Sequence, residues 1–298
     1  MKTKRLLFST GTNHDLAQNI IKKTNIKLGK VDIGTFSNGE TKVFLQEDVT
    51  GKHVYALGST FTPNDNLFTL LLLINTLKVN GAKHITAIIP YYAYAKGDHL
   101  KVPGTSLTAK LIADYIKHAG ADKIICINLH STRVEKFLGK KLIHLDMTEK
   151  LAEEFKKIMP ANMLVVSPDE GGLKRAKQFA KILKVKETAC IKKYHPSLDK
   201  TNSRGIAGNV KNKNVVIFDD MVLSGATIIT ATQELKKAGA KEIYLVVIHI
   251  INTGLGIKRL THEKRIKKVV YANTIPSQKR PNKFKAVDVS DLILKNLN

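Results

Sequence analysis

The sequence predicts an α/β protein whose strands form mainly parallel sheets flanked by helices. Apolar runs of strand length alternate with longer amphipathic segments along the chain of 298 residues. The expected strands are apolar at successive positions rather than at every second one, which indicates that both faces of each sheet are covered. This alternation runs through the chain twice. We therefore expect two similar domains, residues 1–145 and 146–298.

Each expected element follows from its own residues. The apolar runs predict strands at Arg5–Ser9, His53–Gly58, His84–Pro90, Lys123–Leu129, Met163–Ser167, Glu187–Ile191, Val215–Phe218 and Glu242–Ile248. Helical spacing of apolar residues predicts helices near Asp15–Lys23, Leu67–Lys78, Ser106–Lys117, Met147–Lys157, Lys174–Leu183 and Ala226–Ala238. Gly120 and Gly239 supply stop signals for two of these helices. Ligands bind such sheets beyond the carboxyl ends of the strands, so the residues after each strand are the candidates for chemistry.

The composition is typical of a cytoplasmic protein. No apolar run approaches the ~20 residues that a membrane span needs, and the short apolar stretch near the start does not fit a secretory signal. Cys126 and Cys190 lie inside apolar, strand-like runs. Two such cysteines predict reduced core thiols rather than a disulfide framework or a metal cluster.

The net charge of +24 leaves three interpretations open, namely nucleic acid, highly charged anionic small molecules, or solvated lysines without a specific partner. Nucleic-acid readers concentrate basic residues in one patch with aromatics between them. Here the lysines are scattered, aromatics are 6% and Trp is absent, which argues against a dedicated nucleic-acid role. The best candidates for such a patch are Lys264–Lys268 and Lys279–Lys285, whose alternative interpretation is exposed surface charge.

The segment Val215–Thr227 carries the most informative pattern. A four-residue apolar strand ends at Asp219 and Asp220, and a helix then opens with the small residues Ser224, Gly225, Ala226 and Thr227. Free N–H groups and the positive dipole of a helix N-terminus favour an anion, and small residues let the backbone approach a phosphate. The two acids can accept hydrogen bonds from sugar hydroxyls or hold a cation. A diol at one end and a phosphate at the other describe ribose 5-phosphate, and the structural alternative is an acidic helix cap with a tight turn.

Three further strand ends carry polar groups whose roles stay open when each is taken alone. His130 fits a metal ligand, a phosphate contact or a structural histidine. Asp169, followed by two glycines, fits a ligand of Mg²⁺, a partner of a sugar hydroxyl or the start of a helix. Lys193, with His195 close by, fits a cation that neutralises a transferring phosphoryl group or a solvated charge.

Two more segments are compatible with a nucleotide. Pro90–Asp98 combines tyrosines with a cation, which suits base stacking and phosphate contact, although packed tyrosines are an equally common arrangement. The polar turn Thr35–Glu40 is uninformative by itself. The chain has no G-x-x-x-x-G-K-[ST] loop, so any ATP must be held by other means.

Taken together and in this order, the segments resemble the ribose-phosphate pyrophosphokinase (phosphoribosyl diphosphate synthetase) family over nearly the whole chain. The resemblance implies two domains of the type I phosphoribosyltransferase kind, each a mainly parallel sheet flanked by helices. It implies transfer of the β,γ-diphosphoryl group of ATP to O1 of ribose 5-phosphate, which gives phosphoribosyl diphosphate and AMP. Mg²⁺ would bridge the phosphates. A neighbouring subunit would complete the adenine site, so the resemblance implies a homo-oligomer that is at least a dimer.

The resemblance also assigns residues to roles. It implies ATP contacts at Phe36, Asn38, Glu40, Lys96, Gly97, Asp98 and His130. It implies ribose 5-phosphate contacts at Asp169, Asp219, Asp220, Ser224, Gly225, Ala226 and Thr227. The implied metal ligands are His130 and Asp169, and the implied catalytic residues are Lys193 and His195.

Five positions depart from the family pattern. Lys96 and Gly97 stand where the family usually has Arg and Gln, and His195 stands where an Arg is usual. Leu223 replaces an acid or a small polar residue, and Ala226 replaces a Gly. Because Lys lacks the planar fork of Arg, these departures bear on the reaction rate more than on the substrate class.

Two other functions compete with the enzyme hypothesis. One is a non-catalytic or regulatory paralogue that binds a nucleotide or an active synthetase subunit, and the other is a phosphoribosyltransferase. The retained site residues favour an active enzyme over the paralogue: Asp219, Asp220, His130, Asp169 and Lys193. The Asn38 and Glu40 loop, His130 and the duplicated domain argue against a phosphoribosyltransferase.

Overall fold

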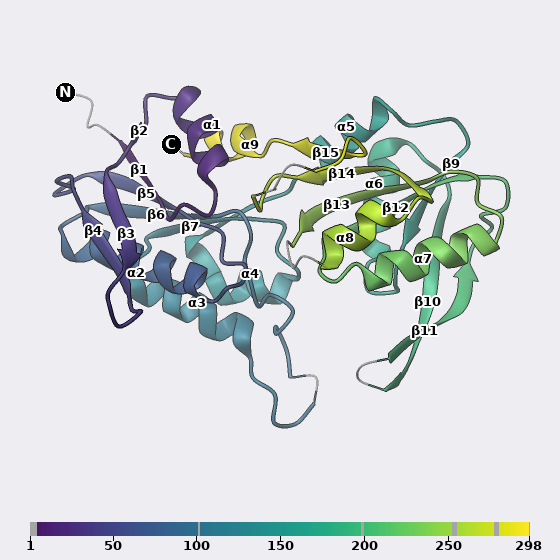
Figure 1. The fold of residues 1–298 in the computed structure, drawn as a ribbon, viewed down its shortest axis with the longest axis horizontal. Coiled ribbons are helices and arrows are strands. Elements are labelled where there is room, and N and C mark those ends of the chain that lie inside the picture. Colours follow the sequence, from purple (N-terminus) through teal and green to yellow (C-terminus); the bar gives the residue numbers. More distant parts are fainter. Residues whose placement is uncertain (1–4, 101, 198–199, 252–254, 277–279, 298) are drawn as a thin grey trace. The chain divides into compact units, whose positions relative to one another are not determined.

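The computed structural model describes residues 5–100, 102–197, 200–251, 255–276 and 280–297, with the backbone alone for residues 193–204. The chain divides into two compact units, each built around one large sheet (Figure 1). Unit 1 comprises Met1–Asp146, Thr274–Pro276 and Asp288–Asn298, and unit 2 comprises Met147–Asn273 and Ser277–Val287. The predicted fold class is confirmed, because mainly parallel strands alternate with helices in both units.

Unit 1 is built on a six-stranded parallel sheet in the order β2-β1-β5-β6-β7-β8. Its strands are β1 (Leu6–Ser9), β2 (Lys27–Leu28), β5 (His53–Leu57), β6 (His84–Ile89), β7 (Lys123–Ile127) and β8 (Leu142–Leu145). Its helices are α1 (His14–Lys22), α2 (Asp65–Val79), α3 (Thr108–Ala119), α4 (Thr132–Leu138), the short 3₁₀ helix η1 (Gly139–Lys141) and α9 (Ser290–Leu294). A separate antiparallel pair, β3 (Val31–Thr35) and β4 (Thr41–Leu45), was not predicted.

The end of the chain packs within unit 1. The ammonium of Lys23, directly after α1, donates to Asp291 at 2.7 Å and to Ser290 at 2.9 Å on α9. The Arg5 guanidinium and the Tyr55 hydroxyl both donate to the carbonyl of Leu297, at 3.0 and 2.6 Å. The last residues, Asp288–Asn298, therefore belong to unit 1. A division into two continuous segments, 1–145 and 146–298, does not include this feature.

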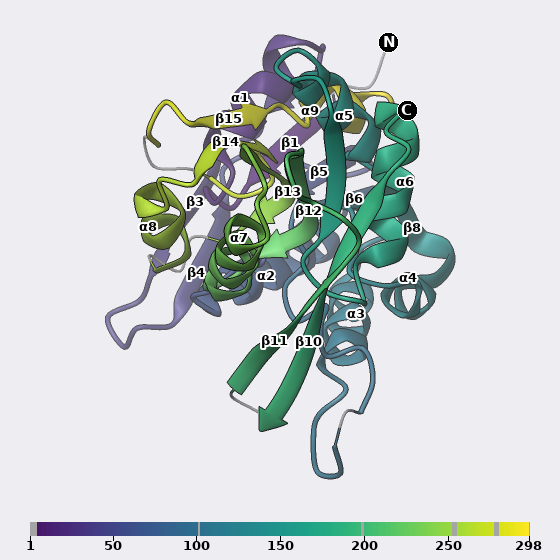
Figure 2. The same cartoon turned by 90° about the vertical axis from the view of Figure 1, so that its right-hand side faces the viewer.

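Unit 2 is built on a seven-stranded sheet in the order β11-β10-β9-β12-β13-β14-β15, in which only the β10–β11 pair is antiparallel. Its strands are β9 (Met163–Ser167), β10 (Thr188–Ser197), β11 (Lys200–Ala207), β12 (Asn214–Val222), β13 (Ile243–Ile250), β14 (Ile266–Ala272) and β15 (Phe284–Val287). Its helices are α5 (Thr148–Lys156), α6 (Leu173–Leu183), α7 (Ala226–Lys237) and α8 (Leu255–His262). Figures 1 and 2 both show the β10–β11 pair extending beyond the other strands of this sheet.

The core of unit 2 continues directly into the predicted ribose-phosphate segment. Phe179 of α6 and Phe218 of β12 are fully buried and stack with their ring centroids 4.2 Å apart. Stacked aromatic rings bury large apolar areas and fix the distance between the elements that carry them. Because Phe218 immediately precedes Asp219 in β12, this packing holds the strand that presents the two acids.

The six predicted helices are all present, with ends within two residues of the prediction. Gly120 adopts the left-handed conformation that ends α3, with φ +119°, and Gly239 does so after α7, with φ +85°. The shorter helices α4, α8 and α9 were not predicted from the sequence. The edge strands β2, β8, β11 and β15, and β14 next to β15, were not predicted either.

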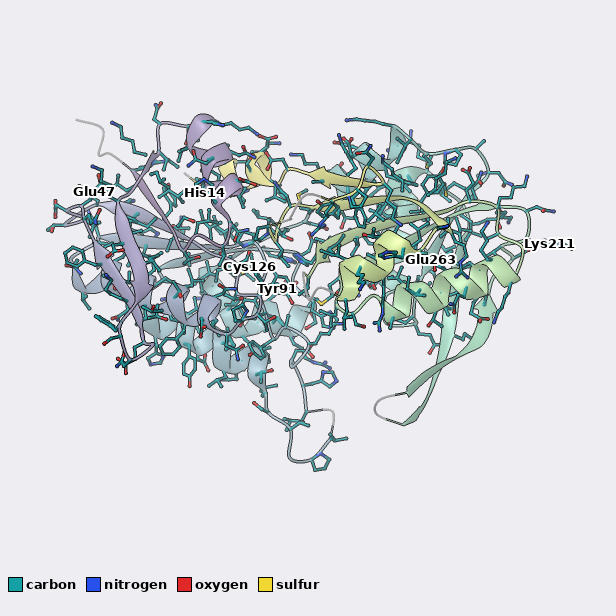
Figure 3. All side chains as sticks on the ribbon, in the orientation of Figure 1. His14, Glu47, Tyr91, Cys126, Lys211 and Glu263 are labelled. Carbon is teal, nitrogen blue, oxygen red and sulfur yellow. The ribbon has the colours of Figure 1, made fainter. Side chains whose placement is uncertain are left out.

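The two cysteines behave as the sequence predicts. Both are buried and neither forms a disulfide. Cys126 lies on β7 in the core of unit 1 (Figure 3), where burial raises the pKa of its thiol. In the described part of the chain, no helix combines the length and the apolar character needed to cross a membrane.

Candidate active site

The predicted ribose-phosphate loop lies in unit 2, between β12 and α7. The strand is longer than predicted, because β12 runs to Val222 and so includes Asp219 and Asp220. Its final residues continue to pair with β13, with Met221 opposite His249 and Val222 opposite Ile250. Only three residues then separate the strand from the first turn of α7. The acids and the helix N-terminus therefore belong to one short, continuous segment, as the sequence predicts.

The backbone of this loop is shaped by glycine. Gly225 has φ +75°, a conformation that side-chain-bearing residues rarely adopt. A Cβ on Gly225 would lie 3.2 Å from the carbonyl oxygen of Gly256 on α8. A Cβ on Gly256 would lie only 2.2 Å from the carbonyl oxygen of Leu223. The loop and α8 thus meet backbone to backbone, and neither glycine has room for a side chain.

Arg259 adds a polar contact between the same two segments. Its Nη1 atom donates to the carbonyl of Ser224 at 2.9 Å. The Ser224 hydroxyl accepts a hydrogen bond from the amide of Ala226 at 3.4 Å, and Ser224 and Thr227 are both exposed. The first N–H groups of a helix have no partner inside the helix. The loop therefore combines small, exposed hydroxyl residues with a helix N-terminus suited to an anion.

Asp219 and Asp220 lie in different environments. Asp220 is 4% exposed, and Arg175 of α6 lies 3.3 Å from its carboxylate. Asp219 is half-buried, and its carboxylate accepts the amide proton of Asp220 at 2.9 Å. Burial, followed by the charges of Asp220 and Asp169, raises the pKa of Asp219 well above its ordinary value, and Arg175 opposes this shift. Three acids of unit 2 thus share one electrostatic neighbourhood with the Arg175 cation.

Asp169 organises the turn between β9 and α6. Its carboxylate accepts the amide proton of Gly172 at 2.9 Å, and its carbonyl accepts the Ser167 hydroxyl at 2.6 Å. A Cβ on Gly172 would lie 2.8 Å from that hydroxyl, so a glycine is needed here. Asp169 therefore closes the turn that leads to Gly172, the N-cap of α6, and its charge also raises the pKa of Asp219.

Two of the segments predicted to contact the nucleotide, residues 96–98 and His130, lie apart in the sequence. In unit 1 a hydrogen bond between Ser131 and Asp98 connects them. Lys96, Gly97 and Asp98 precede α3, and Lys96 is exposed whereas Asp98 is buried. The Ser131 hydroxyl, one residue after His130, donates to the carboxylate of Asp98. Burial by itself raises the pKa of Asp98, but the hydrogen bonds from Ser131 and His99 and the charges of His99 and His130 lower it below its ordinary value.

Phe36, Asn38 and Glu40 lie at the tip of the β3–β4 hairpin. The Phe36 amide donates to the Glu40 carbonyl at 2.8 Å, and the Glu40 amide donates to the Asn38 side chain at 3.1 Å. The Phe36 side chain is 52% exposed. These hydrogen bonds close the tip on itself and leave an aromatic ring accessible.

Lys193 and His195 fall on β10, where the side chains lie outside the part of the structure that is described. The backbone of Lys193 pairs with Ser203 of β11, next to an irregularity in the register between Lys192 and Lys193. The predicted catalytic roles of Lys193 and His195 therefore stay predictions.

The basic run at residues 264–268 engages acceptors within unit 2. The Lys267 ammonium bonds Glu242, and the Lys268 ammonium donates to the carbonyl of Asn282 at 2.7 Å. Lys285, in the second run, lies 3.7 Å from Glu154. Lys279 is outside the described residues. These pairings fit the interpretation of the runs as surface charge.

Arg175, Gly256 and Arg259 were not predicted from the sequence. Arg175 sits on a predicted helix, but its partner is 45 residues away along the chain, and no local pattern reveals such a pair. Gly256 and Arg259 lie on α8, which was not predicted. The one available signal was a glycine within a helical pattern, which often marks close backbone packing.

The close approach of α8 leads to a first prediction. Gly256→Ala places a methyl group against the carbonyl of Leu223, so the loop must move. We expect the affinity for ribose 5-phosphate, measured by calorimetric titration, to fall by roughly ten- to a hundredfold. Gly34→Ala is the matched control, because neither glycine has a positive φ and a Cβ on Gly34 would meet only the end of the Lys42 side chain at 4.0 Å. Equal affinities of the Gly256→Ala protein and the wild type would contradict this role of α8.

The raised pKa of Asp219 leads to a second prediction. Between the ordinary pKa and the raised one, the folded state binds more protons than the unfolded state, so the free energy of unfolding falls as pH rises through this window. Asp219→Asn removes this penalty. We expect the variant to be more stable than the wild type at neutral pH, and the difference to vanish below the ordinary aspartate pKa. Urea unfolding across pH in magnesium-free buffer measures both.

Asp114→Asn is the matched control for the pH experiment. Hydrogen bonds from Lys110 and Lys117 lower the pKa of Asp114. Its stabilising contribution is therefore present at neutral pH and is lost as pH falls through the lowered pKa. The control variant should be less stable than the wild type at neutral pH. The same sign of change in both variants would show that the charges around Asp219 do not act as described.

Comparisons with known proteins bear on this site as a whole. The family description "N-terminal domain of ribose phosphate pyrophosphokinase" matches residues 5–120, and "Phosphoribosyl transferase domain" matches residues 133–290. Ribose-phosphate pyrophosphokinase 1 of Lactococcus lactis is 36% identical over 96% of this chain and 90% of that protein. Ribose-phosphate pyrophosphokinase of Ralstonia nicotianae is 37% identical over 91% of this chain and 86% of that protein.

A solved structure agrees with these relatives. Phosphoribosylpyrophosphate synthetase from Mycobacterium smegmatis matches with a TM-score of 0.91 and 29% identity, covering 98% of this chain and 97% of that chain. The match to the N-terminal pyrophosphokinase domain separates this chain from phosphoribosyltransferases, which the second description alone does not do. The resemblance predicted from sequence is confirmed, and the chain belongs to the ribose-phosphate pyrophosphokinase family.

Proposed function

We propose that this chain is a ribose-phosphate diphosphokinase, which transfers the β,γ-diphosphoryl group of ATP to O1 of ribose 5-phosphate and gives phosphoribosyl diphosphate and AMP. In this reaction a bond forms between O1 and the β-phosphorus, and the bond from that phosphorus to the oxygen of the α-phosphate breaks. The proton of the O1 hydroxyl is lost. The loop of unit 2 carries the proposal, because its acids and its helix N-terminus match the two ends of ribose 5-phosphate.

Unit 2 supplies the proposed sugar site. Ser224, Gly225, Ala226 and Thr227 would hold the 5-phosphate through backbone N–H groups and hydroxyls, helped by the positive end of α7. Asp219 and Asp220 would accept hydrogen bonds from the ribose hydroxyls, with Asp169 as a further sugar contact. Arg175 pairs with Asp220 and so limits the repulsion among these acids. The backbone contact with α8 supports this role, because a rigid loop loses little entropy on binding.

Unit 1 supplies the proposed ATP residues Lys96, Gly97 and His130, with the buried Asp98 directly after Gly97. Lys96 is exposed and carries the cation expected to face a phosphate. Phe36, Asn38 and Glu40 would contact the adenine of an ATP held by a neighbouring subunit. The accessible ring of Phe36 fits such a contact, since exposed aromatic rings stack on bases. This assignment requires at least a homodimer.

Mg²⁺ is the proposed metal, with His130 and Asp169 as its protein ligands. The acids of unit 2 fit a hard cation, because burial and then the charges of Asp220 and Asp169 raise the pKa of Asp219. Mg²⁺ usually takes one or two carboxylates and completes its shell with water and substrate phosphates. When bound, Mg²⁺ would offset the charge of the diphosphate.

The remaining assignments rest on the family. Lys193 and His195 are proposed to neutralise charge on the transferring group. The proposed domains in sequence are residues 1–145 and 146–298. The proposed location is the cytoplasm. The non-catalytic alternative gains no support from the relatives, whose names are those of the enzyme.

A direct assay tests the proposal. Purified protein with ATP, Mg²⁺ and ribose 5-phosphate should produce AMP, and omission of the sugar phosphate should abolish it. Asp220→Ala removes one acid of the sugar site and serves as the inactive control. AMP formation no higher than in that control would refute the enzyme assignment and favour the non-catalytic paralogue.

Lys193 leads to a prediction about rate. If its ammonium stabilises charge only during transfer, Lys193→Ala should lower kcat by roughly a hundredfold or more. The affinity for ribose 5-phosphate, measured by calorimetry, should change by less than about twofold. Lys192→Ala is the matched control, because Lys192 is an exposed neighbour on the same strand. An unchanged kcat in Lys193→Ala would remove Lys193 from the mechanism.

A further inference from the structure

Asp98 is a buried acid whose two oxygens are both engaged within unit 1. It is only 5% exposed. Its Oδ1 atom lies 2.5 Å from Nδ1 of His99, and its Oδ2 atom accepts the Ser131 hydroxyl. Arg133 lies 3.8 Å from the same Oδ2. A carboxylate that is buried and paired in this way is poorly placed to contact a bound nucleotide, and its charge would repel the phosphates of ATP.

The hydroxyl of Ser131 does not cap the helix that follows it. It occupies the N-cap position of α4, with φ −153° and ψ 159°, where a serine ordinarily accepts a hydrogen bond from the first helical N–H groups. No such cap hydrogen bond is present at Ser131. The hydroxyl instead donates to Asp98. The helix start is thus tied to the loop that precedes α3.

The other side of this turn is also fixed. Asn128 has φ +41°, and its side chain donates to Asp146 at 2.7 Å. The amide of Leu129 donates to Nε2 of His144 at 3.0 Å. His130 therefore lies between neighbours that are each held by a side chain from another segment of unit 1. A side chain on such a turn is held in a narrow range of orientations.

We propose that Asp98 is a positioning residue, which fixes the His130 turn through Ser131 rather than contacting ATP itself. This inference rests on the proposed function, in which His130 meets the ATP phosphates and the metal. His99 and Arg133 offset the buried charge of Asp98, so the carboxylate remains ionised as a strong acceptor. Loss of the Asp98–Ser131 bond would leave His130 on a looser turn without altering any residue that touches the nucleotide.

Kinetics of three variants test the proposal. Ser131→Ala removes the donor, and Asp98→Asn leaves one acceptor oxygen for the two donors, His99 and Ser131, that now bond separate carboxylate oxygens. We expect each to raise the KM for ATP or lower kcat by roughly tenfold, about 1.4 kcal/mol of transition-state binding. The KM for ribose 5-phosphate should stay within about twofold. Ser131→Thr keeps the hydroxyl and should restore most of the loss.

The double variant and a control sharpen the test. Asp98→Asn combined with Ser131→Ala should be no worse than the more damaging single variant, because both cut the same bond. Asp114→Asn is the matched control, since Asp114 is a half-buried acid of α3 that pairs with Lys110 and Lys117. Additive losses, an unchanged KM and kcat in Ser131→Ala, or an equal loss with both substrates would overturn the proposal.

A measurement without turnover separates this inference from the proposed function. The imidazole signals of His130, assigned in NMR spectra with a His130→Gln variant, should shift or broaden in Ser131→Ala and return in Ser131→Thr. If the wild type made no AMP, the enzyme assignment would fail. The NMR signals of His130 would still test the positioning role, because they do not depend on turnover. Unchanged His130 signals in Ser131→Ala would refute that role even in an active enzyme.

Discussion

A buried carboxylate must be paired, and this requirement organises the predicted site in each unit. Taking an ionised acid out of water costs several kcal/mol unless hydrogen bonds or a cation compensate. In unit 1 the compensation for Asp98 comes from Ser131, His99 and Arg133. In unit 2 the compensation for Asp220 includes Arg175. Asp98 lies in a loop and Asp220 lies near the end of β12, and each pairing links the acid to a second segment of the same unit.

The pairing and the backbone contacts of unit 2 act on the same short segment. Arg175 holds the acid end of the segment from α6, and Gly256 and Arg259 hold its turn from α8. The stack of Phe179 on Phe218 fixes the strand just before the acids. Two contacts thus hold the end of β12 and two hold the three-residue loop that follows it, so the shape of the segment is set before any ligand arrives. Such preorganisation lowers the entropic cost of binding.

The sequence predicted the fold class and the residues of the loop because both depend on local patterns. Successive apolar residues mark buried strands, and the small-residue turn marks the helix start. The end of β12 was placed too early, since acids are rare in strands. The wholly buried strand β13 continues alongside, and its backbone pairs with Asp219 and the residues that follow. Arg175 and Gly256 could not be predicted, because their partners lie far away along the chain.

The packing around Asp98 explains what the departures from the family pattern at Lys96 and Gly97 involve physically. A Cβ on Gly97 would lie 1.9 Å from the hydroxyl oxygen of Thr108 in the first turn of α3. The Thr108 side chain therefore occupies the space from which a larger residue at position 97 would project. A glutamine at position 97 requires Thr108 to move, so the two positions are coupled. The two departures lie at an exposed cation and at a glycine that packs against a threonine, whereas the acid beside them is buried and paired with His99 and Ser131.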